Sequence, residues 1–117
     1  MSDLNSGIPC DGWWHQEVFG RQPMKELRLK FDSGSIFGSG RDIIGLFTFR
    51  GKIDENGRVA MVKQYIGQHS VDYVGTYDGE GLLYGEWHIR DMKDRWLIRI
   101  KGFSSSSSSK EEIATID

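Results

Sequence analysis

The chain has 117 residues, a formal net charge of −2 and a pI near 5.9. This length suffices for one ordinary domain and not for two, and the charge balance excludes a global basic field that would attract nucleic acid. Cys10 is the single cysteine, so an internal disulfide is excluded, and no stretch approaches the roughly 18 apolar residues of a membrane-spanning helix.

The first twelve residues are polar and contain Gly7, Pro9 and Gly12, which predicts an irregular N-terminal arm over 1–12. The sequence does not open with a basic and apolar leader, and we expect a cytoplasmic protein.

From residue 13 onward, short stretches alternate apolar and polar side chains with a period of two, which is typical of half-buried antiparallel strands. Leu27, Leu29 and Phe31, for example, alternate with charged residues. Asn56 and Gly57 form one of the strongest short hairpin signals. Strands are predicted over 13–19, 24–31, 36–40, 45–53, 58–65, 70–77, 82–89 and 95–101. Turns are predicted over 20–23, 32–35, 54–57, 78–81 and 91–94.

This pattern predicts an all-β domain over 13–103, an antiparallel meander of about eight strands. An open sheet of this size would leave two edges and a bare apolar face. Closure into a small up-and-down barrel removes both problems, so we expect a barrel, with a two-sheet sandwich as the alternative. The segment 104–117 begins with six consecutive serines and is predicted to be a flexible tail.

The two faces of the strands can be assigned from the same alternation. If the hairpin at Asp78–Gly81 has a loop of odd length, Gly75 lies opposite Gly85 and Tyr73 opposite Trp87. Odd-numbered positions would then face the interior from the second to the seventh strand, and the loop at 91–94 would reverse this parity in the eighth.

Lys63 falls on the predicted interior face, where an isolated ammonium must be paired, hydrogen-bonded or neutralised. One interpretation is a ligand-binding cup at one end of the barrel, lined by Lys63, Tyr65, His69, Tyr73 and Trp87. The other is structural: the Lys63 stem lines the barrel while its head reaches the rim, and His69 is an exposed loop histidine.

Other polar residues give weaker signals. His15 and His88 have no cysteine or carboxylate at metal-ligand spacing, so we expect neither a metal site nor a cofactor. Asp42 is expected to accept bonds from turn amides rather than to act in catalysis. No nucleophile and base can be paired by spacing, so an enzyme is the least favoured class. Trp13 and Trp14 must point to opposite sides of a strand, which makes this region a candidate contact surface, including one between copies of the chain.

Gly12 and Trp13 before the first strand, followed by eight short strands punctuated by glycines, resemble the calycin-type barrels, that is, avidins and lipocalins. The resemblance implies a ligand cavity at the barrel mouth. No biotin- or retinoid-binding residue set matches, so it assigns no site residue. The segment 73–85 is also similar to one membrane-occupation-and-recognition repeat, but no second copy follows.

Two functions therefore remain open. The first is a non-enzymatic barrel that binds a small, partly apolar ligand at its mouth. The second is a packed structural or protein-interaction domain without a cavity. The volume left inside the barrel separates them.

Overall fold

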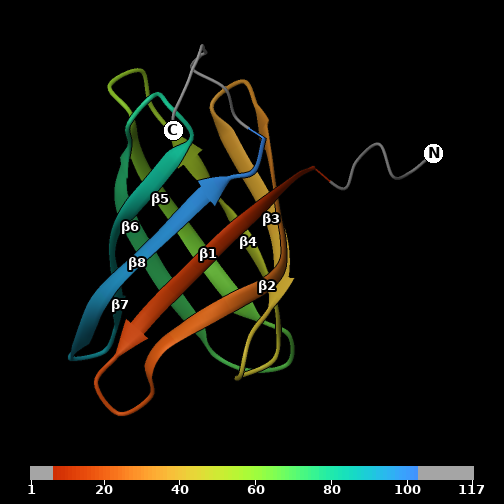
Figure 1. The fold of residues 1–117 in the computed structure, drawn as a ribbon. Coiled ribbons are helices and arrows are strands. Elements are labelled where there is room, and N and C mark those ends of the chain that lie inside the picture. The colour runs from red at the N-terminus through yellow and green to blue at the C-terminus, as the bar shows by residue number, and fades with distance from the viewer. Residues whose placement is uncertain (1–6, 103–117) are drawn as a thin grey trace, which may run out of the picture.

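The structure is a computed structural model and describes residues 7–102 of the chain. Eight antiparallel strands follow one another in a meander (Figure 1). They are β1 (Ile8–Gln16), β2 (Gly20–Asp32), β3 (Ser35–Arg41), β4 (Leu46–Ile53), β5 (Arg58–Tyr65), β6 (Ser70–Tyr77), β7 (Leu82–Ile89) and β8 (Met92–Ile100). The described part holds no helix that is long and apolar enough to cross a membrane.

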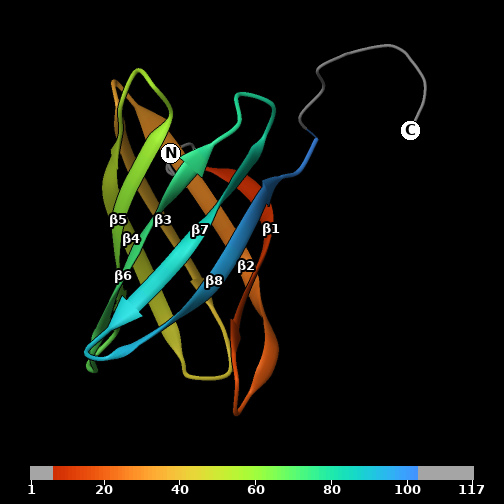
Figure 2. The same cartoon turned by 90° about the vertical axis from the view of Figure 1, so that its left-hand side faces the viewer.

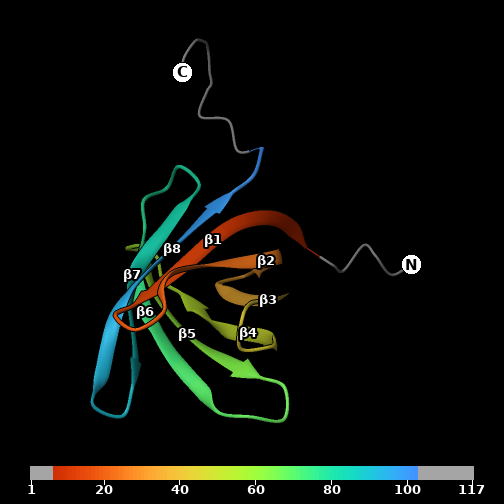
Figure 3. The same cartoon turned by 60° about the horizontal axis from the view of Figure 1, so that its bottom comes forward.

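The meander closes into a barrel because β1 pairs with both β2 and β8. Trp14 lies opposite Trp96 across the closing seam. Figures 2 and 3 show the strands tilted around a common axis, with β8 returning beside β1. Closure pairs each of the eight strands on both sides, which satisfies the backbone groups that an open edge would leave unpaired. The predicted fold class is therefore confirmed, and the sandwich is not formed.

The ends of several strands differ from the sequence prediction. β1 begins at Ile8 because 8–10 pair with 27–29 of β2, so part of the predicted arm is strand. The predicted turn over 20–23 lies inside β2, and the chain turns at 17–19 instead. The β7–β8 turn is likewise shorter than predicted, and β8 begins at Met92. The Ser-rich tail lies outside the described residues.

The predicted pairing of β6 with β7 is confirmed, with Gly75 opposite Gly85 and Tyr73 opposite Trp87. Odd positions face inward from β4 to β7, and β8 reverses the parity as expected. The extension of this rule to β3 is wrong. Ile36 is fully buried, whereas Phe37 is 42% exposed. The cause is the two-residue turn Ser33 and Gly34, which sets Phe31 opposite Ile36 and so exchanges the faces.

Two glycines explain how the wall of the barrel bends between β6 and β7. A Cβ on Gly75 would lie 1.9 Å from the carbonyl oxygen of Tyr84, and one on Gly85 would lie 2.0 Å from that of Val74. The two strands can approach this closely only because neither residue has a side chain.

The interior is filled by large apolar side chains over most of the barrel length. Phe47, Phe49, Leu27, Leu29 and Trp96 are each at most 2% exposed. Pairs of rings meet edge to face, as in Phe47 with Phe49 at 5.4 Å between centroids. At one end, the lower one in Figure 1, the turns after β1, β3, β5 and β7 surround the opening of the barrel. This end is called the barrel mouth below.

Candidate functional site

The centre of the site is a fully buried ion pair that lies among apolar side chains of the barrel interior. Lys63 projects inward from β5, and its Nζ lies 2.6 Å from Oδ2 of Asp42. Neither side chain has any exposed area. Asp42 belongs to the segment 42–45 between β3 and β4, which turns back on itself because the Asp42 amide donates to the Gly45 carbonyl. This turn directs the carboxylate into the mouth of the barrel.

Both oxygens of the Asp42 carboxylate accept hydrogen bonds. Oδ2 accepts hydrogen bonds from the Trp14 indole at 2.9 Å and the Tyr65 hydroxyl at 2.8 Å, as well as from Lys63. Oδ1 accepts the backbone N–H of Ile44 at 2.9 Å. The predicted role of Asp42 as an acceptor for a turn amide is thus confirmed. Its larger role, as the counterion of Lys63, was not predicted.

The surroundings of Lys63 combine one counterion with several rings. Its Nζ donates to the Tyr73 hydroxyl oxygen at 3.2 Å and lies 4.2 Å from the centre of the Phe47 ring. The ring faces add cation–π attraction to the ion pair. Burial lowers the pKa of Lys63 to about 8, and the neighbouring Asp42 carboxylate opposes this shift. The lysine is therefore still charged at neutral pH.

A cavity of about 130 Å³ opens at the barrel mouth beside this pair. Its wall is largely aromatic and aliphatic. The lining residues are Trp14, Gln16, Phe19, Ile44, Tyr65, His69, Val71, Tyr73, Trp87, Ile89 and Met92. Trp14, Tyr65 and Tyr73 both line the cavity and bond to Asp42 or Lys63, so the ion pair lies directly behind the cavity floor.

The structure brings together four of the five residues of the predicted cup. Tyr65, His69, Tyr73 and Trp87 line the cavity. Lys63 does not, because its ammonium is directed at Asp42 behind the floor. The snorkelling alternative also differs from the structure, since the Lys63 side chain is fully buried.

Within the cup the residues differ in exposure. His69 is exposed at the rim, where its ring lies 5.1 Å from that of Tyr65. Tyr73 is 2% exposed and packs against Phe49 and Trp96. Burial raises the pKa of both tyrosines well above the usual value, and Asp42 adds to the shift. Both hydroxyls therefore keep their protons near neutral pH.

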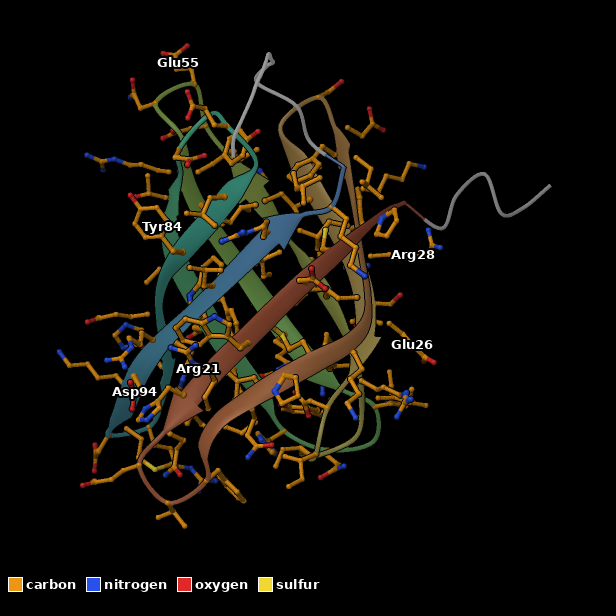
Figure 4. All side chains as sticks on the ribbon, in the orientation of Figure 1. Arg21, Glu26, Arg28, Glu55, Tyr84 and Asp94 are labelled. Carbon is orange, nitrogen blue, oxygen red and sulfur yellow. The ribbon has the colours of Figure 1, made fainter. Side chains whose placement is uncertain are left out.

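Trp87 is held at the edge of the cavity by a chain of hydrogen bonds. Its indole N–H donates to the carbonyl oxygen of His15 at 2.8 Å. The His15 ring in turn is bonded through Nδ1 to the Asp94 carboxylate at 2.9 Å. Asp94 lies near the lower left end of the barrel in Figure 4. Neither His15 nor Asp94 was predicted to support the site, because β1 and β8 meet only through closure of the barrel.

Among residues 7–102, no three His, Cys, Asp or Glu side chains come together as a metal-binding group. Cys10 is buried in the core, its Sγ donates to the Ile8 carbonyl, and burial raises the pKa of its thiol to about 11. Trp13 lies on the outside of β1 and is half-buried. The guanidinium carbon of Arg21, which is labelled in Figure 4, lies 4.1 Å from the centre of the Trp13 ring.

Comparisons of the chain with family models, with curated proteins and with solved structures found no match. The chain is a small, closed, up-and-down β-barrel with one polar pair sealed beneath an aromatic mouth.

The two partners of the ion pair are expected to differ in their importance for stability. Asp42→Asn removes the counterion of a buried ammonium and should lower the free energy of unfolding by about 3–5 kcal/mol. Lys63→Met should cost less than half as much, because Asp42 keeps its bonds from Trp14, Tyr65 and the Ile44 amide. Urea denaturation followed by tryptophan fluorescence measures both, with Asp91→Asn, at an exposed turn position, as the control. Equal losses for the two core variants would contradict this account.

The same pair should make stability depend on pH. The pKa of Lys63 is about 8 in the folded chain, against 10.5 for the unperturbed side chain. Between these values the unfolded chain binds more protons, so the contribution of Lys63 to the free energy of unfolding rises with pH. Below pH 8 both states are protonated, and the full cost of burying the charge remains.

Tyr65, Tyr73 and Cys10 act in the opposite direction at high pH, because folding raises their pKa values. We therefore expect the effect of Lys63 to appear in a difference between two free energies of unfolding, that of the native chain minus that of Lys63→Met. This difference should grow in favour of the native chain by about 3 kcal/mol from pH 8 to pH 10.5. Denaturation at a series of pH values measures it, and a flat difference would show that Lys63 does not titrate as described.

Proposed function

We propose that this barrel is a non-enzymatic binding protein that holds a small, partly apolar ligand in the cavity at its mouth. The observation that carries the proposal is the aromatic cavity of about 130 Å³ in a barrel that is otherwise filled. A core needs no such space, because protein interiors pack to the density of organic crystals. A cavity at the mouth also agrees with the resemblance to calycin-type barrels.

The size of the cavity limits the size of the ligand. Pockets for drug-sized molecules usually measure about 300–1,000 Å³. An apolar cavity of about 150 Å³ accepts benzene. The cavity described here therefore suits a molecule of about one ring and a small substituent.

The polar groups around the cavity support binding rather than proton transfer. The Asp42 carboxylate is occupied by four donors, and the Lys63 ammonium is shared between Asp42, Tyr73 and ring faces. Trp87 is fixed through its bond to the His15 carbonyl. The cavity thus has rigid walls, which lowers the entropic cost of holding a ligand.

Toluene is a suitable probe of this proposal. We expect saturable NMR shifts at the Trp87 indole N–H and at the His69 and Ile44 amides in the native chain. Val71→Phe places a ring in the cavity and should weaken binding at least about tenfold, which corresponds to roughly 1.4 kcal/mol. Thr48→Phe adds the same ring to an exposed position of β4 and should leave binding unchanged. Absence of saturable shifts in the native chain would refute the proposal.

A second candidate function, protein interaction, is favoured by the outer wall of the barrel. Phe37, Val62, Val74 and Tyr84 are each 40–42% exposed there, on β3, β5, β6 and β7. Together with Ala60 they are called the outer apolar patch. Tyr84 lies on the outside of the wall in Figure 4. Exposed apolar residues that gather on one surface often mark a contact with another protein.

The charges beside this patch favour a second copy of the chain as the partner. Arg50 lies next to Val62 on one side, and Asp72 lies next to Val62 on the other. A two-fold axis running along β5 would therefore place Arg50 of one copy opposite Asp72 of the other. Such a self-complementary arrangement is the usual form of a symmetric dimer interface.

The test is the oligomeric state in solution. We expect sedimentation velocity to show a dimer that Val62→Lys dissociates, because a cation would then lie in the middle of the interface. Val18→Lys, at a residue that is 83% exposed on the β1–β2 turn, is the matched control. Added salt should weaken the dimer by screening the charge pairs. A native chain that stays monomeric at high concentration would exclude this partner.

A further inference from the structure

Four indole or phenol groups line the cavity, those of Trp14, Tyr65, Tyr73 and Trp87, and three of them already donate a hydrogen bond within the chain. An indole or phenol group has a single hydrogen to donate. Trp14 and Tyr65 donate theirs to Asp42, and Trp87 donates to His15. None of these three is available to a ligand without breaking a bond that holds the site together.

Tyr73 is different. Its hydroxyl oxygen accepts a hydrogen bond from the Lys63 ammonium at 3.2 Å, but its own hydrogen has no acceptor within residues 7–102. The residue is only 2% exposed and lines the cavity. A buried donor without an acceptor is unusual in proteins, because the missing hydrogen bond costs stability. The bond received from Lys63 also polarises the phenol and makes it a stronger donor.

The charge of the floor restricts the ligand further. Lys63 and Asp42 neutralise one another, and the titratable groups in the wall are limited to Tyr65, Tyr73 and the rim residue His69. An ionic ligand would lose its hydration and find no free counterion at the floor. A neutral ligand loses little, and its ring can pack edge to face against the aromatic wall.

We propose that the cavity takes a neutral, single-ring aromatic ketone or aldehyde, whose carbonyl oxygen accepts the free hydrogen of the Tyr73 hydroxyl. This inference rests on the proposed function and names the ligand class of the same cavity. The ring of the ligand packs against the aromatic wall near Trp87, and its carbonyl points toward Tyr73 at the cavity floor. Lys63 acts through Tyr73 as a positioning residue.

Acetophenone and isopropylbenzene form a matched pair of probes, with the same ring, the same number of heavy atoms and a carbonyl in only one of them. Isopropylbenzene is less soluble in water, which favours its binding to any apolar site, so the readout is a ratio of the two dissociation constants. In Tyr73→Phe the preference for acetophenone should fall about tenfold relative to the native chain. Tyr77→Phe, the same deletion at the opposite end of the barrel, should leave the ratio unchanged.

The outcomes separate this inference from the proposed function. If neither compound binds the native chain, both fail. If both bind but the ratio is the same in the native chain and in Tyr73→Phe, the ligand class is wrong while the cavity remains a binding site. If Tyr73→Phe does not fold, the infrared carbonyl stretch of acetophenone bound to the native chain decides. A shift to lower frequency than in hexane supports the hydrogen bond, and an unshifted band overturns it.

Discussion

The structure depends on one buried interaction, the ion pair of Lys63 with Asp42. Burying two charges costs several kcal/mol per ion before any attraction is counted, so such a pair persists only when its remaining hydrogen-bonding capacity is satisfied. Here Trp14 and Tyr65 donate to Asp42, and Tyr73 accepts from Lys63. These partners come from β1, β5 and β6, so satisfying the ion pair fixes the relative positions of strands from different parts of the barrel.

The cavity follows from this arrangement. The residues that satisfy the pair are long and aromatic, and their polar ends meet at one point behind the floor. Their rings then stand around the mouth rather than filling it, and the space of about 130 Å³ lies between them. Trp87 is fixed by its bond to the His15 carbonyl and borders this space. The same polar network thus seals the core below and keeps the mouth open.

Much of the fold could be predicted because local sequence patterns determine the strands and turns. The two-residue alternation and the turn residues between the stretches predicted eight strands, and an odd-length loop at Asp78–Gly81 gave the correct register of β6 with β7. The prediction failed where a local rule was extended too far. A two-residue turn at Ser33 and Gly34 exchanges the faces of β3, and Phe37 is exposed although its number is odd. Hairpin length decides the facing of the next strand, and the sequence signals for a turn do not fix that length.

For the site, the alternation alone determined that Lys63 and Tyr65 share one face of β5, because residues two apart in a strand point to the same side. Only the tertiary structure decided what Lys63 meets there. Asp42 lies 21 residues away in a turn between two other strands, where no period applies to its side chain. Likewise, the meeting of His15 with Asp94 exists only because β1 and β8 close the barrel. Periodicity assigns a side chain to a face, but its partner across the barrel is set by closure, which joins residues distant in sequence.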